Sequence, residues 1–145
     1  VIVGDGELRQ KLVQTASSYG LADRIRFLGT LSHEMLAKEL STSQIFALSS
    51  VTEGLPKALL EAMASGCACI STDVGECRAV LNAAGLIVDP RDPTSLAQAL
   101  DSLIGSRSLV NTLGAKAIKR AQNFTWQSYR DKHMAIYQSL LGHRR

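Results

Sequence analysis

The sequence is poor in aromatic residues, and this scarcity bears on its partners. Phenylalanine, tryptophan and tyrosine together make up 5% of the 145 residues. Proteins that bind single-stranded nucleic acids stack the bases on aromatic side chains, so this composition argues against such a surface. The net charge of +3 is mild and does not demand a polyanionic partner. We therefore expect no nucleic-acid partner.

Cysteines are also few, and their spacing is typical of neither a disulfide framework nor a metal site. Cys67, Cys69 and Cys77 are an odd number without a repeated CxxC pattern. No group of His and Cys residues has the spacing of zinc ligands, so we expect no metal. Cys67 and Cys69 are expected to be small core residues, and Cys77 a packed thiol. This usage favours a reduced, cytoplasmic protein.

Long apolar runs are absent as well. The sequence contains neither a signal peptide nor a run of about 18 apolar residues, so we expect nothing that spans a membrane. With 46% hydrophobic and 20% charged residues, residues 1–145 have the composition and length of one globular domain. The chain has no initiator Met and opens on an apolar run at residues 1–3. Because domains seldom begin in mid-core, we expect a fragment truncated at its N-terminus.

Short apolar runs alternate with amphipathic segments along the chain. Strands are predicted at residues 1–3, 24–28, 45–48, 68–72 and 84–88. Helices are predicted at residues 7–19, 33–40, 56–65, 76–81 and 108–123, with two more beginning near residues 93 and 126. We expect Leu8, Leu12 and Ala16 to form the buried face of the first helix. The alternation predicts an α/β fold: a Rossmann-like, doubly wound parallel sheet with helices on both faces.

Residues 49–66 form the segment around which the rest is organised. Gly54 and Pro56 end the apolar run of the preceding strand. Pro56 also suits the first position of a helix. Gly66 suits the position just after its end. Most of this helix is apolar, with Leu59, Ala62 and Met63 on the face expected to be buried. A narrow polar stripe is left, formed by Lys57, Glu61 and Ser65.

The polar stripe allows two interpretations. In the first, Lys57 and Glu61 form a surface ion pair of little energetic weight. In the second, the free amides after Pro56 and the positive end of the helix dipole bind an anion. Glu61 would then accept hydrogen bonds from a ribose diol, and Glu53 from a second polyhydroxylated group. A phosphate between two such carboxylates describes a nucleotide sugar.

Residues 53–66, which read EGLPKALLEAMASG, resemble the E-x7-E signature of the family-4 retaining glycosyltransferases. Further resemblance lies at residues 1–6 (VIVGDG), 26–29 (RFLG), 71–75 (STDVG) and 84–88 (AGLIV). Each segment alone is weak evidence for the resemblance, but the ordered series is strong and covers nearly the whole chain. One departure follows residue 75, where the family often has a second glycine and then an acidic residue. This chain reads GECRA there, so the family's donor contacts of that loop are not carried over.

The resemblance implies the donor-binding, C-terminal half of a two-domain GT-B enzyme. By analogy, Glu53 is the catalytic-site carboxylate that binds the donor-sugar hydroxyls, and Glu61 holds the ribose. Leu31 touches the base, largely through its backbone. The sugar or diphosphate is met by backbone at Gly54, Leu55, Lys57 and Ala58. No metal or other cofactor is implied, and the acceptor-binding half, together with an Arg and a Lys that bind the diphosphate, lies outside this chain.

The implied parent enzyme moves a hexosyl or N-acetylhexosaminyl unit from a UDP- or GDP-sugar to an acceptor hydroxyl. The expected acceptor is a glycan or lipid-linked saccharide, in O-antigen or lipopolysaccharide-type polysaccharide biosynthesis. The parent is expected in the cytoplasm, with peripheral association at the inner face of the plasma membrane, and the isolated chain is expected to transfer nothing. Two alternatives stay open: a non-catalytic Rossmann-type module for NAD or a bare nucleotide, and a sugar-nucleotide epimerase on the same fold.

Overall fold

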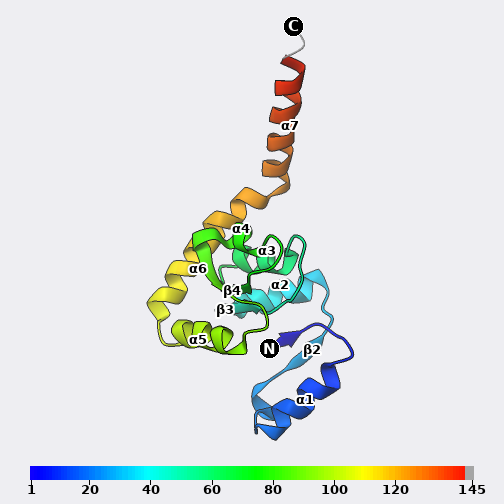
Figure 1. Ribbon diagram of the computed structural model, residues 1–145, viewed down its shortest axis with the longest axis vertical. Helices are drawn as coiled ribbons and strands as arrows, with labels where there is room; N and C mark the ends of the chain where they lie inside the picture. The colour runs from blue at the N-terminus through cyan, green and yellow to red at the C-terminus, as the bar shows by residue number, and fades with distance from the viewer. Residues whose placement is uncertain (143–145) are drawn as a thin grey trace. The chain divides into compact units, whose positions relative to one another are not determined.

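The computed structural model describes residues 1–142, and the chain divides into two compact units (Figure 1). The first unit is Val1–Glu39 and the second is Leu40–Arg145. Each unit has its own hydrogen-bonded sheet, with two strands in the first and three in the second. The strands of both sheets pair in parallel. Parallel sheets flanked by helices confirm the predicted α/β architecture.

The first unit is built on a two-stranded sheet. Its elements are β1 (Ile2–Val3), α1 (Arg9–Ser18), the 3₁₀ helix η1 (Ala22–Arg24), β2 (Phe27–Gly29) and the start of α2 (His33–Thr42). Gly20 follows the end of α1 in the left-handed conformation, with φ of +67°, which is common for a glycine just past a helix end. Ser32 caps α2 by accepting a hydrogen bond from the Met35 N–H at 3.3 Å. In this unit, the residues that flank the helices therefore mark the end of α1 and the start of α2.

Burial in the first unit differs from the prediction. The run at residues 1–3 was expected to be a buried strand, yet Val1, Ile2 and Val3 are 59%, 39% and 42% exposed. Leu8 and Leu12 are also exposed, and Ala16 is the one buried residue of α1. The reason is that, among residues 1–142, β1 has a single strand neighbour, β2. The predicted strand at residues 24–28 is shorter, because η1 includes Arg24 and β2 begins at Phe27.

The second unit has the larger core. Its elements are β3 (Ile45–Leu48), α3 (Lys57–Ala64), β4 (Ala68–Thr72), α4 (Cys77–Leu81), η2 (Asn82–Ala84), β5 (Gly85–Val88), α5 (Pro93–Ile104), α6 (Arg107–Ala121), η3 (Gln122–Phe124) and α7 (Trp126–Gly142). The strand order is β3-β4-β5, and all five residues of the central strand β4 are buried. Helices α5 and α6 lie against each other and against β4 (Figure 1). Their Leu103 and Leu113 pack with Ala68 and Ile70 of that strand.

Side-chain caps set the beginnings of the later helices. The Asp92 carboxylate accepts from the Ser95 N–H at 3.0 Å and caps α5, and the Thr125 hydroxyl accepts from the Ser128 N–H at 3.1 Å and caps α7. Both caps lie at the residues where the sequence indicated helix starts. Helix α6 instead begins at Arg107, after the N-cap Ser106, one residue before the predicted start.

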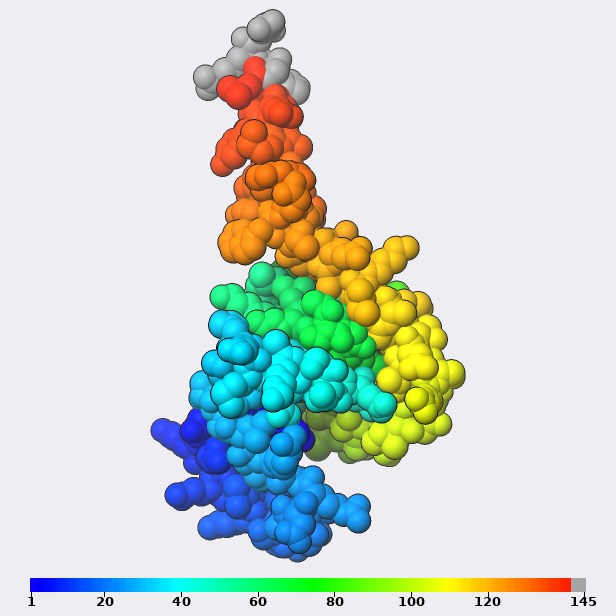
Figure 2. Space-filling view, turned by 180° about the vertical axis from the view of Figure 1, so that it is seen from behind, coloured from blue at the N-terminus to red at the C-terminus, as the bar shows by residue number. Residues whose placement is uncertain are grey.

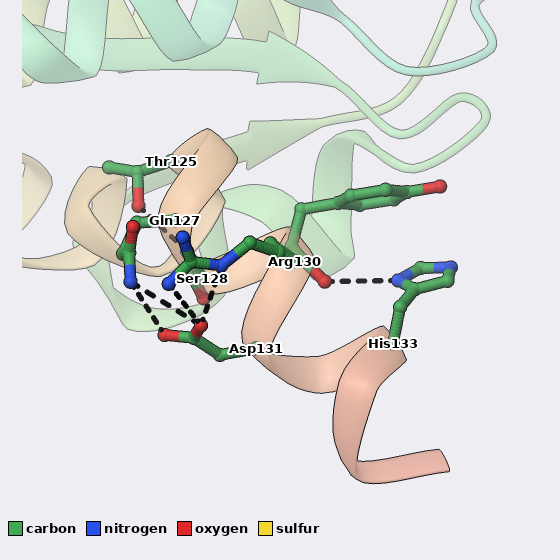
Figure 3. A network of polar contacts seen from close by, with 7 residues as sticks. Thr125, Gln127, Ser128, Arg130, Asp131 and His133 are labelled. Carbon is green, nitrogen blue, oxygen red and sulfur yellow. Dashed lines mark hydrogen bonds and ion pairs between the residues drawn. The ribbon is translucent and has the colours of Figure 1, made fainter. Parts of the chain in front are cut away.

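Several polar contacts lie within helix α7. Gln127 and Arg130 donate hydrogen bonds to the Asp131 carboxylate, and the His133 ring bonds to the backbone carbonyl of Tyr129 (Figure 3). The helix is the orange-to-red segment of Figure 2. Its large apolar side chains are exposed, and Trp126 is 87% exposed. Over residues 1–142, no helix combines the length and the apolar character needed to cross a membrane.

Candidate functional site

The start of α3 offers unpaired backbone donors. Strand β3 ends at Leu48, a loop follows, and α3 begins at Lys57, one residue later than the predicted start at Pro56. Pro56 is the N-cap residue and is buried. As a proline it has no side-chain oxygen with which to cap the helix, while its carbonyl accepts from the Leu60 N–H at 3.2 Å. The first-turn amides therefore lack intrahelical partners and can bind an anion.

The rest of α3 fixes where those amides point. Leu59, Ala62 and Met63 are fully buried, as predicted from their spacing. Gly66 follows the helix with φ of +83°, also as predicted. On the polar side, Lys57 is exposed and Glu61 is half-buried. The helix is thus anchored along its apolar face while its first turn and polar stripe remain accessible.

Glu53 lies in the loop before α3 and is held by a neighbour in that loop. It is half-buried, and its Oε1 accepts a hydrogen bond from the Ser50 hydroxyl at 2.7 Å. The Ser50 carbonyl in turn accepts from the Thr72 hydroxyl at 2.6 Å. Sequence reasoning missed both contacts. The i, i+3 spacing of Ser50 and Glu53 was the available signal, since short hydroxyl side chains often bond within a turn.

The loop after β4 closes against the loop that carries Glu53. Gly75 has φ of +50°, and a Cβ at this position would clash with the backbone carbonyls of Glu53 and Gly54. The Glu76 N–H donates to the Gly54 carbonyl at 3.2 Å. Glycine is therefore required here for both conformation and space. The loops that follow the carboxyl ends of β3 and β4 form one continuous backbone contact.

An ion pair borders the same loop. Arg78 donates two hydrogen bonds to the Asp73 carboxylate, from Nε at 2.9 Å and from Nη2 at 2.6 Å. These bonds hold the pKa of Asp73 below its ordinary value of 3.8. The bidentate geometry ties the end of β4 to the first turn of α4. Asp73 and Arg78 therefore brace the turn that contains Gly75.

The predicted site residues fall in both units. Glu53, Gly54, Leu55, Lys57, Ala58 and Glu61 lie in the second unit, in the loop before α3 and its first two turns. The side chains of Leu55 and Lys57 are exposed. Leu31 belongs to the first unit, in the loop between β2 and α2, and is half-buried. Its predicted contact with a base, like the ligand roles of the other residues, stays a prediction.

The cysteines are free and buried, as the sequence indicated. Burial is the main reason why the pKa of the Cys69 thiol is raised to about 12, and the charge of the neighbouring Cys67 adds to the increase. Burial likewise raises the pKa of Cys67. Neither thiol is a nucleophile at neutral pH. Within residues 1–142, no three His, Cys, Asp or Glu side chains are grouped so that they could hold a metal ion.

Comparison with known families decides what this arrangement belongs to. The profile described as "Glycosyl transferases group 1" matches residues 1–120. The chain belongs to this family. The match spans both units and includes the α3 site, so the resemblance on residues 53–66 is confirmed at the level of the family.

Among curated proteins, the D-inositol 3-phosphate glycosyltransferase of Corynebacterium diphtheriae is 30% identical over 127 residues. The match covers 86% of this chain and 30% of that protein. This group 1 glycosyltransferase chain therefore spans about a third of the length of the curated relatives it matches.

Two solved structures show the shared fold. The C-terminal domain of a group 1 glycosyltransferase (LpcC) from Francisella tularensis matches with a TM-score of 0.74 and 26% identity, over 81% of this chain and 62% of that one. The Anabaena protein Alr3699/HepE, solved in complex with UDP-glucose, matches with a TM-score of 0.81 and 22% identity, over 94% of this chain and 40% of that one. Such neighbours are GT-B glycosyltransferases, in agreement with the predicted fold class.

Proposed function

We propose that this chain is the nucleotide-sugar-binding, C-terminal domain of a retaining GT-B glycosyltransferase of family 4. The observation that carries the proposal is the open first turn of α3, with a half-buried carboxylate before it, Glu53, and another further along it, Glu61. The similarity to an isolated C-terminal domain from F. tularensis supports the domain assignment. The donor is a UDP- or GDP-linked sugar, and the same fold holds UDP-glucose in the Anabaena protein.

Each part of the site has a role in this proposal. The amides of Lys57 and Ala58, with backbone at Leu55, hold the diphosphate at the positive end of the α3 dipole. Glu61 lies about 6 Å along the helix axis from Lys57 and accepts hydrogen bonds from the ribose hydroxyls. Glu53 accepts hydrogen bonds from hydroxyls of the donor sugar. Because an ionised carboxylate only accepts hydrogen bonds, both residues select hydroxyl donors.

The chemistry follows from where charge develops. Transfer breaks the bond between the sugar and the diphosphate and forms a bond between the sugar and the acceptor oxygen, whose proton is released. The departing diphosphate gains negative charge. Amides already aimed at that charge stabilise the transition state without having to reorganise. In this proposal the whole enzyme, with its acceptor-binding half, transfers the sugar to a lipid-linked or surface saccharide at the inner face of a bacterial membrane. This chain alone binds the donor and transfers nothing.

Calorimetric titration of the chain with UDP, GDP and ADP, and then with their glucose conjugates, tests the proposal. Glu61→Ala should weaken binding of the nucleoside diphosphate about tenfold, because ribose hydroxyls lose a charged acceptor. Glu53→Gln should leave the diphosphate affinity in place and remove the preference for the sugar-bearing form. Asp101→Asn, an exposed carboxylate change on α5, is the matched control. Unchanged affinities in both Glu variants, or tight binding of NAD, contradict the assignment.

A further inference from the structure

We propose that Ser50 is a positioning residue for Glu53: anchored by Thr72, it holds one carboxylate oxygen so that the other meets the donor sugar. The inference rests on the proposed donor-binding role of Glu53. It extends the site to two residues that lie outside the E-x7-E pattern. Four hydrogen bonds and one close backbone contact at Gly75 carry it.

The first contact fixes the carboxylate. The Ser50 hydroxyl lies 2.7 Å from Glu53 Oε1. An ionised carboxylate has no proton to give, so the serine must be the donor. Bonds of this kind are short and stronger than those between neutral groups. Within residues 1–142, no hydrogen bond reaches Glu53 Oε2, so that oxygen is available to a ligand hydroxyl.

The second contact fixes the serine. The Thr72 hydroxyl lies 2.6 Å from the Ser50 carbonyl and 3.4 Å from the Leu48 carbonyl. Thr72 is the last residue of β4 and is 3% exposed. Because β4 is the central strand, its end is among the most constrained parts of the second unit. The loop that carries Ser50 is therefore tied to the sheet immediately after β3 ends.

The third contact fixes the backbone of Glu53. An added Cβ at Gly75 would clash with the Glu53 carbonyl, so the two loops are in direct backbone contact. The Glu76 N–H also bonds to the Gly54 carbonyl at 3.2 Å. Glu53 is consequently held at both ends, through its backbone by the turn at Gly75 and through its side chain by Ser50.

Holding Glu53 in advance has a specific consequence for binding. A glutamate side chain has several rotatable bonds, and ordering it on binding costs conformational entropy. Ser50 removes part of that cost before the ligand arrives, which raises affinity for a ligand that uses Glu53. A ligand that does not reach Glu53 gains nothing. Ser50 should therefore affect the affinity for UDP-glucose but not that for UDP.

The test compares UDP and UDP-glucose affinities by calorimetry in matched variants. Ser50→Ala should lower the preference for UDP-glucose over UDP about tenfold at an unchanged UDP affinity. Ser50→Thr, which keeps the hydroxyl, should retain most of the preference. Thr72→Val keeps the shape of Thr72 but loses its hydroxyl, and should lower the preference about threefold. Ser49→Ala, at the exposed neighbouring serine, is the control and should change neither affinity.

The outcomes separate this inference from the proposed function. If Glu53→Gln removes the UDP-glucose preference but Ser50→Ala leaves it, the positioning role is wrong and the donor site stands. If Ser50→Ala lowers both affinities equally, Ser50 is merely structural and the inference is overturned. If Glu53→Gln leaves the preference intact, both proposals are wrong. Thermal unfolding checks each variant, and Ser50→Cys, with its weaker donor, replaces Ser50→Ala if that variant does not fold.

Discussion

The two units contain apolar runs of similar character and bury them to very different extents. In the first unit, Val1, Ile2 and Val3 are each more than a third exposed, whereas in the second unit every residue of β4 is buried. Both runs have the composition of a strand in a parallel sheet. The difference therefore lies in what surrounds them. Apolar composition shows that a strand can be buried, and its neighbours decide whether it is.

The neighbours are easy to identify. Strand β4 lies between β3 and β5, and helices α3, α4, α5 and α6 all contact it. In the part of the chain that the structure describes, strand β1 pairs with β2 alone. Parallel sheets are stable when both faces are covered and both edges of inner strands are paired. The second unit meets this condition within itself, and this supports the loops that carry the proposed donor site.

The largest expected contrast between the units is in thiol reactivity. Burial raises the pKa of Cys69 to about 12, so at pH 8 its thiolate fraction is roughly 1,000-fold lower than that of an ordinary thiol. A Leu12→Cys variant places a reporter on the half-exposed face of α1. In native protein treated with iodoacetamide, mass spectrometry should find residue 12 modified and Cys69 intact. Modification of both at rates within a factor of about ten would break the comparison.

The next contrast concerns glycines. Gly114 of α6 is buried, and an added Cβ would clash with the Gly66 carbonyl, so Gly114→Ala should destabilise the chain by about 3 kcal/mol. Gly6 in the first unit has open space around the same position and no positive φ. Gly6→Ala should therefore change stability by no more than about 0.5 kcal/mol. Urea unfolding measures both, and equal effects would show that packing in the second unit is looser than described.

The smallest contrast uses an ion pair from each unit. Because Arg78 lowers the pKa of Asp73, the ionised pair adds stability above the ordinary value of 3.8, and that stability is lost as the pH falls through the lower folded value. In Arg78→Gln, the free energy of unfolding should therefore fall less as the pH is lowered. Arg26→Gln removes the Arg26–Glu39 pair of the first unit but leaves Asp73 paired, so the slope should persist. Unfolding midpoints from about pH 2 to pH 6 measure it. If Arg78→Gln leaves the pH dependence of stability unchanged, the Asp73–Arg78 pair is not its cause.

Local features of the fold could be predicted well. The predicted strand at residues 68–72 coincides with β4, and Asp92, Thr125 and Ser32 cap helices where expected. These features depend on a few adjacent residues, such as a hydroxyl or carboxylate before an apolar pattern. The buried face of α3 was also predictable, because its period of 3.6 residues is visible in the sequence.

The features that failed depend on residues far apart in the sequence. Exposure of Val1 and Leu8 depends on how many elements pack around them, which no local pattern reports. The Thr72 bond to Ser50 joins positions 22 residues apart, and the Gly75 contact with Glu53 joins two separate loops. Residues 53–66 indicated the proposed site, but the contacts that hold its loop come from Thr72 at the end of β4 and from the turn at Gly75.

The contact at Gly75 limits which substitutions position 75 can accept during evolution. A blocked side chain can usually be relieved by a second mutation that trims the obstructing neighbour. At position 75 the obstruction is the carbonyl of Glu53 and that of Gly54, atoms that every amino acid possesses. A suppressor screen starting from Gly75→Ala should therefore return reversions to glycine rather than compensating changes at positions 53 or 54.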